Sequence, residues 1–232
     1  MKSSVVFLFG AWSLLVLPPT YCDKITPSQA KLQSVSLSDY LRTMGKKLDC
    51  YFTIERDDRG PHRLTNFRKE SSLSTAKISD NEQITSVEKL TMKLKKIFPK
   101  AEFLTSKHAG DHALVLHITD ASLMESQNYV LNQKLSIKYS GLLQGLPDAI
   151  GTKLENFIGP PQTVTTEDLM KGNLDQQTRI GINVDNKAIR DTLTDAVPKL
   201  QDNRILWDAE AVTRDGIEVV EVKYFRPILR HS

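Results

Sequence analysis

Cysteine is scarce, because the 232 residues include only Cys22 and Cys50. Cys22 falls in an apolar leader segment, so a mature chain without that segment has one thiol and no disulfide framework. Cys50 lies in residues 48–55, where apolar and polar residues alternate as in a half-buried strand. We therefore expect Cys50 to be a small core residue rather than a reactive thiol.

Several functional motifs are absent as well. The chain has no Gly-x-Ser-x-Gly, no His-Glu-x-x-His, no phosphate-binding glycine loop and no closely spaced cysteine pair. Those patterns place a nucleophile, a metal ion or a nucleotide. An Asn-x-Ser/Thr sequon is also missing, which favours a bacterial envelope over a glycosylating secretory route. We expect no catalytic, cofactor-binding or metal-binding residue, and no cofactor.

The longest apolar run covers residues 5–17, with Lys2 before it and Pro18-Pro19 after it. This arrangement is typical of a secretory signal peptide. Its roughly 13 residues are too few for a helix to cross about 30 Å of hydrocarbon. We predict a signal peptide at residues 1–22 and a secreted, periplasmic protein that has no transmembrane segment after cleavage.

Two other fates of this leader segment stay open. It could remain uncleaved as an interfacial anchor, or Cys22 could be retained and carry a lipid. Lipid attachment requires a small residue immediately before the cysteine, and Tyr21 stands there.

Charge of either sign is not in large excess: 31 Lys and Arg against 28 Asp and Glu give a formal net charge of +3. This balance excludes a strongly basic protein, and we expect no nucleic-acid partner. One stretch is locally basic, with only Glu102 to oppose six lysines: Lys89, Lys93, Lys95, Lys96, Lys100 and Lys107. It is interpreted either as a solvated helix face or as a surface for anionic lipid or a carboxylate-rich partner.

The first predicted helix has a clear start signal. Ser36 and Asp39 are spaced as a capping box, and apolar residues follow with helical spacing. We predict a helix that begins at Leu37 and leads directly into a strand at residues 48–55.

A second helix is predicted at residues 81–98, where Pro99 stops it. Two strands should follow at residues 101–108 and 112–119. The loop between them contains Gly110, which we expect to supply a positive φ.

The second half predicts a similar mixture of elements: a strand at residues 129–139, a helix at 146–158, a strand at 180–185, a helix at 189–197, and strands at 204–211 and 217–225. Asn186 is expected to cap the later helix. The last two strands should be joined by a turn that contains Gly216.

A helix followed by a strand or a strand pair thus recurs at residues 36–55, 81–119 and 186–225. This order predicts an α+β fold: two small domains built from βαββ-type units, with helices packed on one face of small mixed sheets. We expect an N-terminal α+β domain at residues 23–125 and a C-terminal α+β domain at residues 126–232.

One cluster contains residue types that ligate metals. His108 and His112 flank the predicted loop between two strands, and Asp111 lies beside them. Together they could form a three-ligand site. His117 lies further along the same strand, on the face opposite to His112. We consider exposed loop histidines the better interpretation.

Two stretches share one pattern of core positions: residues 35–45 running into 48–53, and residues 182–193 running into 205–207. The pattern resembles the short N-terminal domain of bacterial secretins and TonB-dependent receptors, which is a small periplasmic module. The resemblance implies a protein-docking role in the cell envelope and no catalytic residue. The second stretch departs from the pattern because Pro198 shortens its helix.

From the leader segment, the missing motifs and this resemblance, we expect a non-enzymatic protein-interaction module of the bacterial cell envelope with an envelope protein as partner. It would act through sheet edges or exposed helix faces. The alternatives are an envelope hydrolase, or a small-molecule or lipid-binding protein, whose site forms only in three dimensions. The sequence does not indicate the oligomeric state.

Overall fold

The computed structural model describes residues 34–59, 73, 77–79, 83–126, 128–158, 162–166, 178–198 and 203–225. The predicted signal peptide lies outside these residues. Within them, no helix is both long enough and apolar enough to cross a membrane.

The helices are α1 (Leu37–Leu48), α3 (Val87–Ile97), α4 (Ala121–Glu125), α5 (Leu146–Ile158) and α6 (Ile189–Ala196). The longer strands are β2 (Cys50–Asp57), β4 (Ala101–Lys107), β5 (Leu114–Asp120), β6 (Lys134–Leu142), β8 (Arg179–Ala188), β9 (Ile205–Arg214) and β10 (Ile217–Tyr224). The shorter strands are β1 (Ser34–Ser36), β3 (Lys77–Ser79) and β7 (Gln162–Thr166). Most predicted elements are found, but two begin later than predicted. The helix expected from residue 81 begins at Val87, and the strand expected from residue 129 begins at Lys134 because Val130–Asn132 form a 3-10 helix.

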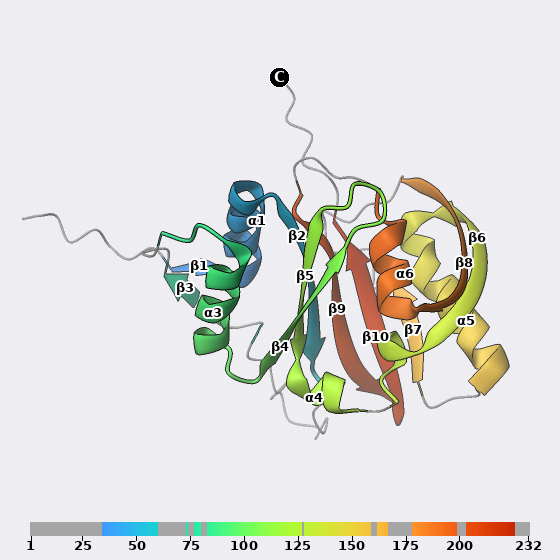
Figure 1. The fold of residues 1–232 in the computed structure, drawn as a ribbon. Helices are drawn as coiled ribbons and strands as arrows, with labels where there is room; N and C mark the ends of the chain where they lie inside the picture. Colours follow the sequence, from blue (N-terminus) through green and yellow to red (C-terminus); the bar gives the residue numbers. More distant parts are fainter. Residues whose placement is uncertain are drawn as a thin grey trace, which may run out of the picture. The chain divides into compact units, whose positions relative to one another are not determined.

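A six-stranded mixed sheet in the order β4-β5-β2-β9-β10-β7 forms the centre of the fold (Figure 1). Its β4–β5 and β9–β10 pairs are antiparallel, and its β5–β2, β2–β9 and β10–β7 pairs are parallel. Two further antiparallel pairs, β1–β3 and β6–β8, lie outside this sheet. The fold is therefore a mixed α/β architecture.

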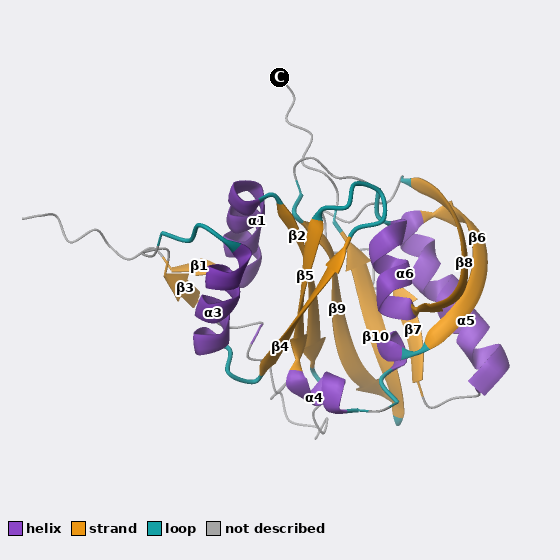
Figure 2. Ribbon diagram, in the orientation of Figure 1, coloured by secondary structure: helices purple, strands orange, loops and turns teal. Residues whose placement is uncertain are grey.

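Helices cover both faces of the central sheet, with α1 and α3 on one side and α5 and α6 on the other (Figure 2). The prediction of helices on a single face is wrong. The reason lies in β2, whose first six residues are all buried. Cys50, Phe52 and Ile54 face the core beneath α1 and α3, while Tyr51 faces the core beneath α5 and α6.

The central sheet draws strands from both halves of the chain. β2, β4 and β5 precede residue 125, while β7, β9 and β10 follow it, and β2 pairs directly with β9. All the described residues belong to one compact unit. The boundary that we expected between residues 125 and 126 does not divide the sheet, because strand pairing between distant segments leaves no local signal.

The start of α1 agrees with the capping prediction. The Ser36 hydroxyl accepts a hydrogen bond from the Asp39 amide at 3.1 Å. At the other end, Asp49 adopts a φ of 50°, and its amide donates to the Gly45 carbonyl. This left-handed residue ends the helix and turns the chain straight into β2.

The turn between β9 and β10 also forms where it was predicted. Asp215 and Gly216 have φ values of 50° and 80°. Two successive positive φ values suit a two-residue hairpin loop, because that loop matches the twist of the strands.

Asn186 does not cap α6, so that prediction is wrong. It lies within β8 with a φ of 47°, and its amide donates to the Ser136 hydroxyl of β6 at 3.0 Å. The residue before α6 is Ala188, which offers no side-chain cap. Asparagine tolerates the left-handed conformation well, and here that property serves the β6–β8 pair instead of a helix end.

Candidate functional site

The loop between β4 and β5 buries a histidine that we expected to be exposed. The side chain of His108 is only 2% exposed. Its Nδ1 lies 2.9 Å from the Asp111 carboxylate, and its Nε2 lies 2.8 Å from the Val197 carbonyl. With both ring nitrogens engaged, His108 has none left for a metal. Among the described residues, no group of three or more His, Cys, Asp or Glu side chains is placed to hold a metal ion.

The loop between β4 and β5 instead connects the sheet to the end of α6 by hydrogen bonds. The Ala109 amide donates to the Asp195 carboxylate at 3.2 Å, and the Tyr51 hydroxyl donates to Asp111 at 3.2 Å. His112, not Gly110, has the positive φ in this loop, at 56°. The candidate ligands His108 and Asp111 therefore have a structural role.

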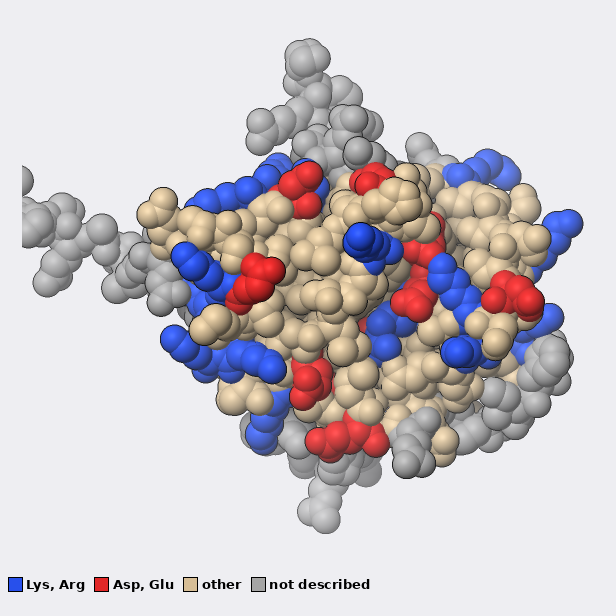
Figure 3. All heavy atoms as spheres, in the orientation of Figure 1, with Lys and Arg blue, Asp and Glu red and all other residues tan. Residues whose placement is uncertain are grey.

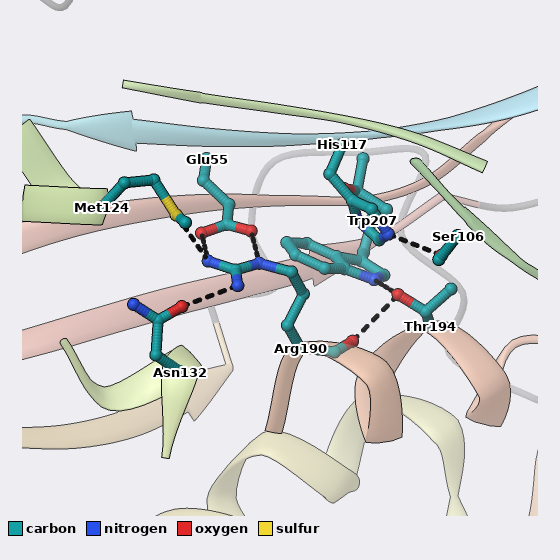
Figure 4. Close-up of polar contacts among 9 residues, drawn as sticks. Glu55, Ser106, His117, Met124, Asn132, Arg190, Thr194 and Trp207 are labelled. Atoms are coloured by element: carbon teal, nitrogen blue, oxygen red, sulfur yellow. Dashed lines mark hydrogen bonds and ion pairs between the residues drawn. The ribbon is translucent and has the colours of Figure 1, made fainter. Parts of the chain in front are cut away.

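His117 is the second buried histidine, and it lies on β5 between two hydroxyl groups (Figure 4). Its Nδ1 is 2.7 Å from the Thr53 hydroxyl of β2, and its Nε2 is 2.8 Å from the Ser106 hydroxyl of β4. A hydroxyl can donate to one ring nitrogen or accept from the other, so both contacts suit a neutral ring.

The surroundings of His117 keep its ring neutral. Burial lowers its pKa to about 4, and the positive charge of Arg190 acts in the same direction. Near neutral pH this ring carries no charge. Sequence reasoning placed His117 on a strand but did not identify its two hydroxyl partners, because they come from separate strands.

A buried ion pair lies beside His117 in the same layer (Figure 4). Glu55 of β2 accepts two hydrogen bonds from Arg190 of α6, at 2.5 and 2.9 Å. Arg190 also donates to the Asn132 side chain at 2.6 Å and lies 3.5 Å from the Met124 sulfur. Burial opposes the charge of Arg190, but the bonds and charge of Glu55 outweigh it and raise the pKa of the guanidinium.

Sequence reasoning missed this pair. In residues 48–55 the polar positions were assigned to a solvent-facing side, so Glu55 was not singled out. In the structure that side faces the core beneath α6, where Glu55 has no exposed surface. An alternating pattern does not show that both faces of a strand are buried. No local feature of the sequence links Glu55 to Arg190.

β4 forms one edge of the central sheet, and β7 forms the other. β4 is an outer strand that pairs, among the described residues, with β5 alone. The His108 amide bonds back toward β5, at Ala113. Because backbone groups alternate in direction along an antiparallel strand, those of Phe103, Thr105 and Lys107 point away from β5.

Four of the six lysines in the predicted basic stretch lie on α3, while Lys100 lies between α3 and β4 and Lys107 ends β4. Lys89, Lys95, Lys96 and Lys100 are exposed, whereas Lys93 is 9% exposed and lies 5.1 Å from the centre of the Tyr40 ring. Lysine and arginine side chains gather over the α3 region of the surface in Figure 3.

The chain matches no protein-family model, no curated protein and no solved structure.

Proposed function

We propose that this chain is a secreted, periplasmic, non-enzymatic protein-interaction module of the bacterial cell envelope. The outer edge of β4, with which no other described strand pairs, carries the proposal. Backbone groups of Phe103, Thr105 and Lys107 face away from the sheet, and a partner strand can pair with such an edge. Leu104, which is 36% exposed on the same strand, offers an apolar contact beside those hydrogen bonds.

The arrangement of buried polar groups supports a scaffold role. Glu55 and Arg190 bind each other, and His117 lies between two hydroxyls. His108 ties its loop to the end of α6. These groups hold the elements of the fold together.

Chemical cross-linking in the native envelope, followed by purification of the tagged protein, tests this proposal. Thr105→Pro removes one outward N–H without removing a β4–β5 hydrogen bond. Thr105→Val is the matched control, since it changes the side chain and keeps the N–H. A stoichiometric partner should be captured by the wild type and by Thr105→Val, and lost with Thr105→Pro.

Two results would overturn the proposal. One is capture of no stoichiometric protein by the wild type. The other is equal capture by all three proteins when their circular dichroism spectra agree, because the edge would then have no role in binding.

The envelope location depends on residues 1–22 and has its own test. Mass spectrometry of the protein from the envelope fraction should find a mature chain that begins at Asp23. A chain that retains Cys22 with a lipid would still place it in the envelope, whereas an unprocessed cytosolic protein would contradict the location.

A hydrolase remains the second candidate because of one observation. The Ser106 hydroxyl lies 2.8 Å from Nε2 of His117, which is the spacing of a nucleophile and its general base. Thr53 stands where a carboxylate usually orients the base, and a His117 pKa of about 4 makes the ring a weak base. A fluorophosphonate probe that labels the wild type but not Ser106→Ala would favour this candidate.

A further inference from the structure

An open hollow of about 320 Å³ lies along α3. Its lining residues are Gln83, Ile84, Lys89, Met92, Lys93 and Lys96. We call this surface the α3 hollow. Its volume falls at the small end of the range for ligand sites, enough for a side chain or two of a partner.

The lysines of the α3 hollow share one helix face. Lys89, Met92, Lys93 and Lys96 follow the spacing of neighbours on a helical surface. None of the six lining residues is acidic. Two acidic residues adjoin the lining residues in the sequence: Glu82 precedes Gln83, and Glu88, which is exposed in the first turn of α3, precedes Lys89. The hollow therefore concentrates positive charge.

Met92 supplies the apolar part of this surface. It is 64% exposed, more than any other large hydrophobic side chain among the described residues. Its flexible thioether can adapt to different apolar partners, which is how methionine serves in binding surfaces. Lys93 is fixed against the Tyr40 ring, so part of the charge is held in place before any ligand arrives.

We propose that the α3 hollow binds an acidic peptide segment of a protein partner, with carboxylates on Lys89 and Lys96 and an apolar side chain against Met92. This inference rests on the proposed interaction function and adds a second contact to the edge of β4. The two surfaces are adjacent in the chain, because α3 ends at Ile97 and β4 begins at Ala101.

A protein segment fits this surface better than an anionic bilayer does. A helix that lies on a membrane inserts a broad apolar face. The apolar face of α3 is turned into the core, where Leu90 and Leu94 have no exposed surface. Met92 alone is left to insert, and Lys93 is too buried to reach a flat surface. A peptide can enter the hollow and contact both Met92 and Lys93.

The test uses the mature chain and a fluorescent peptide of sequence Glu-Glu-Leu-Glu-Glu, followed by fluorescence anisotropy. The changed protein carries Lys89→Glu and Lys96→Glu. The matched control carries Lys95→Glu and Lys100→Glu, which alters the net charge equally at exposed positions outside the hollow. All four side chains are exposed, and each variant reverses one lysine of the last turn of α3, so the unfolding midpoints of the two variants should be similar.

Binding should weaken about tenfold or more with the hollow variant, which corresponds to about 1.4 kcal/mol, and by less than about threefold with the control. Replacement of Leu by Ser in the peptide should also weaken binding to the wild type. Raised salt should weaken binding because the contact is between partly exposed charges.

Three results would overturn the inference. The wild type could fail to bind the peptide at millimolar concentration, both variants could lose equal affinity, or phosphatidylglycerol vesicles could bind through the hollow when the peptide does not.

The Thr105→Pro experiment separates the two proposals. Loss of its cross-link with no peptide binding leaves the interaction function standing and the hollow refuted. If the peptide binds at the hollow but no partner is cross-linked, the interaction function is refuted and the hollow remains a peptide-binding site.

Discussion

Glu55 on β2 and Arg190 on α6 lie 135 residues apart in the chain and are joined by two hydrogen bonds. The pair connects the centre of the sheet to the helix that covers it. Both side chains are buried, so each charge depends on the other to offset the hydration that it has lost.

Removal of one member of this pair should be costly. Arg190→Met leaves the Glu55 carboxylate buried without its cation, and we expect the free energy of unfolding to fall by about 3–5 kcal/mol. The double variant Arg190→Met with Glu55→Leu removes both charges and should recover most of that loss. Urea denaturation measures both changes. Equal losses in the single and double variants would show that the charge pairing is not what matters.

The neutral state of His117 predicts a pH dependence of stability. Its folded pKa is about 4, while an unfolded histidine has a pKa of about 6.5. Between these values the unfolded chain binds a proton that the folded chain does not, so acid favours unfolding. Above about pH 6.5 His117 should not lower the free energy of unfolding. As the pH falls from 6.5 toward 4, its protonation in the unfolded chain should lower that free energy by up to about 3 kcal/mol.

His117→Gln is the control for that experiment. It retains polar contacts with Thr53 and Ser106 but cannot take up a proton. As the pH falls from 6.5 to 4, the wild type should lose stability relative to His117→Gln. The contributions of other titrating groups cancel in this comparison. A constant difference would contradict a buried neutral histidine.

Gly151 should not tolerate a side chain. A Cβ at this position of α5 would lie 2.2 Å from the Val164 carbonyl oxygen and 2.8 Å from the Thr163 hydroxyl. The helix and β7 would have to separate, so Gly151→Ala should lower the unfolding free energy by about 1–3 kcal/mol despite the better helix propensity of alanine. Gly181→Ala is the control, since nothing lies within 4 Å of its added carbon. Similar stability of both variants would be inconsistent with this close crossing.

The thiol of Cys50 should be unreactive in the folded protein. Burial raises its pKa to about 11, partly opposed by the positive charge of Arg204. Little thiolate is therefore present at pH 8, and the side chain has no exposed surface. Ellman's reagent should modify Cys50 in a Cys22→Ser protein only after denaturant is added. Rapid reaction in native buffer would mean that β2 is accessible.

The features that sequence reasoning predicted well are those with local causes. The Ser36 cap, the stop of α5 near Ile158 and the turn at Gly216 each depend on a few neighbouring residues. The predicted hairpin of β4 and β5 belongs to the same group, because the two strands are joined by one short loop. These signals place helices and strands along the chain, but not in space.

What could not be predicted depends on contacts between distant segments. β2 pairs in parallel with β9, about 150 residues later, and nothing in either strand specifies the other. For the same reason the sequence did not show that Glu55 meets Arg190, or that His117 meets Thr53 and Ser106. An alternating pattern predicts that the polar residues of β2 face solvent, but in the structure they face a second hydrophobic core.

The position of β2 has a consequence for how the chain folds during synthesis. Its two neighbours, β5 and β9, come from residues 114–120 and 205–214, so one side of β2 stays unpaired until the last part of the described chain has been made. Closing such a long loop is entropically costly, which slows folding and prolongs the exposure of an apolar edge. A nascent chain of this protein should therefore need a chaperone, or delayed folding, until β9 is available.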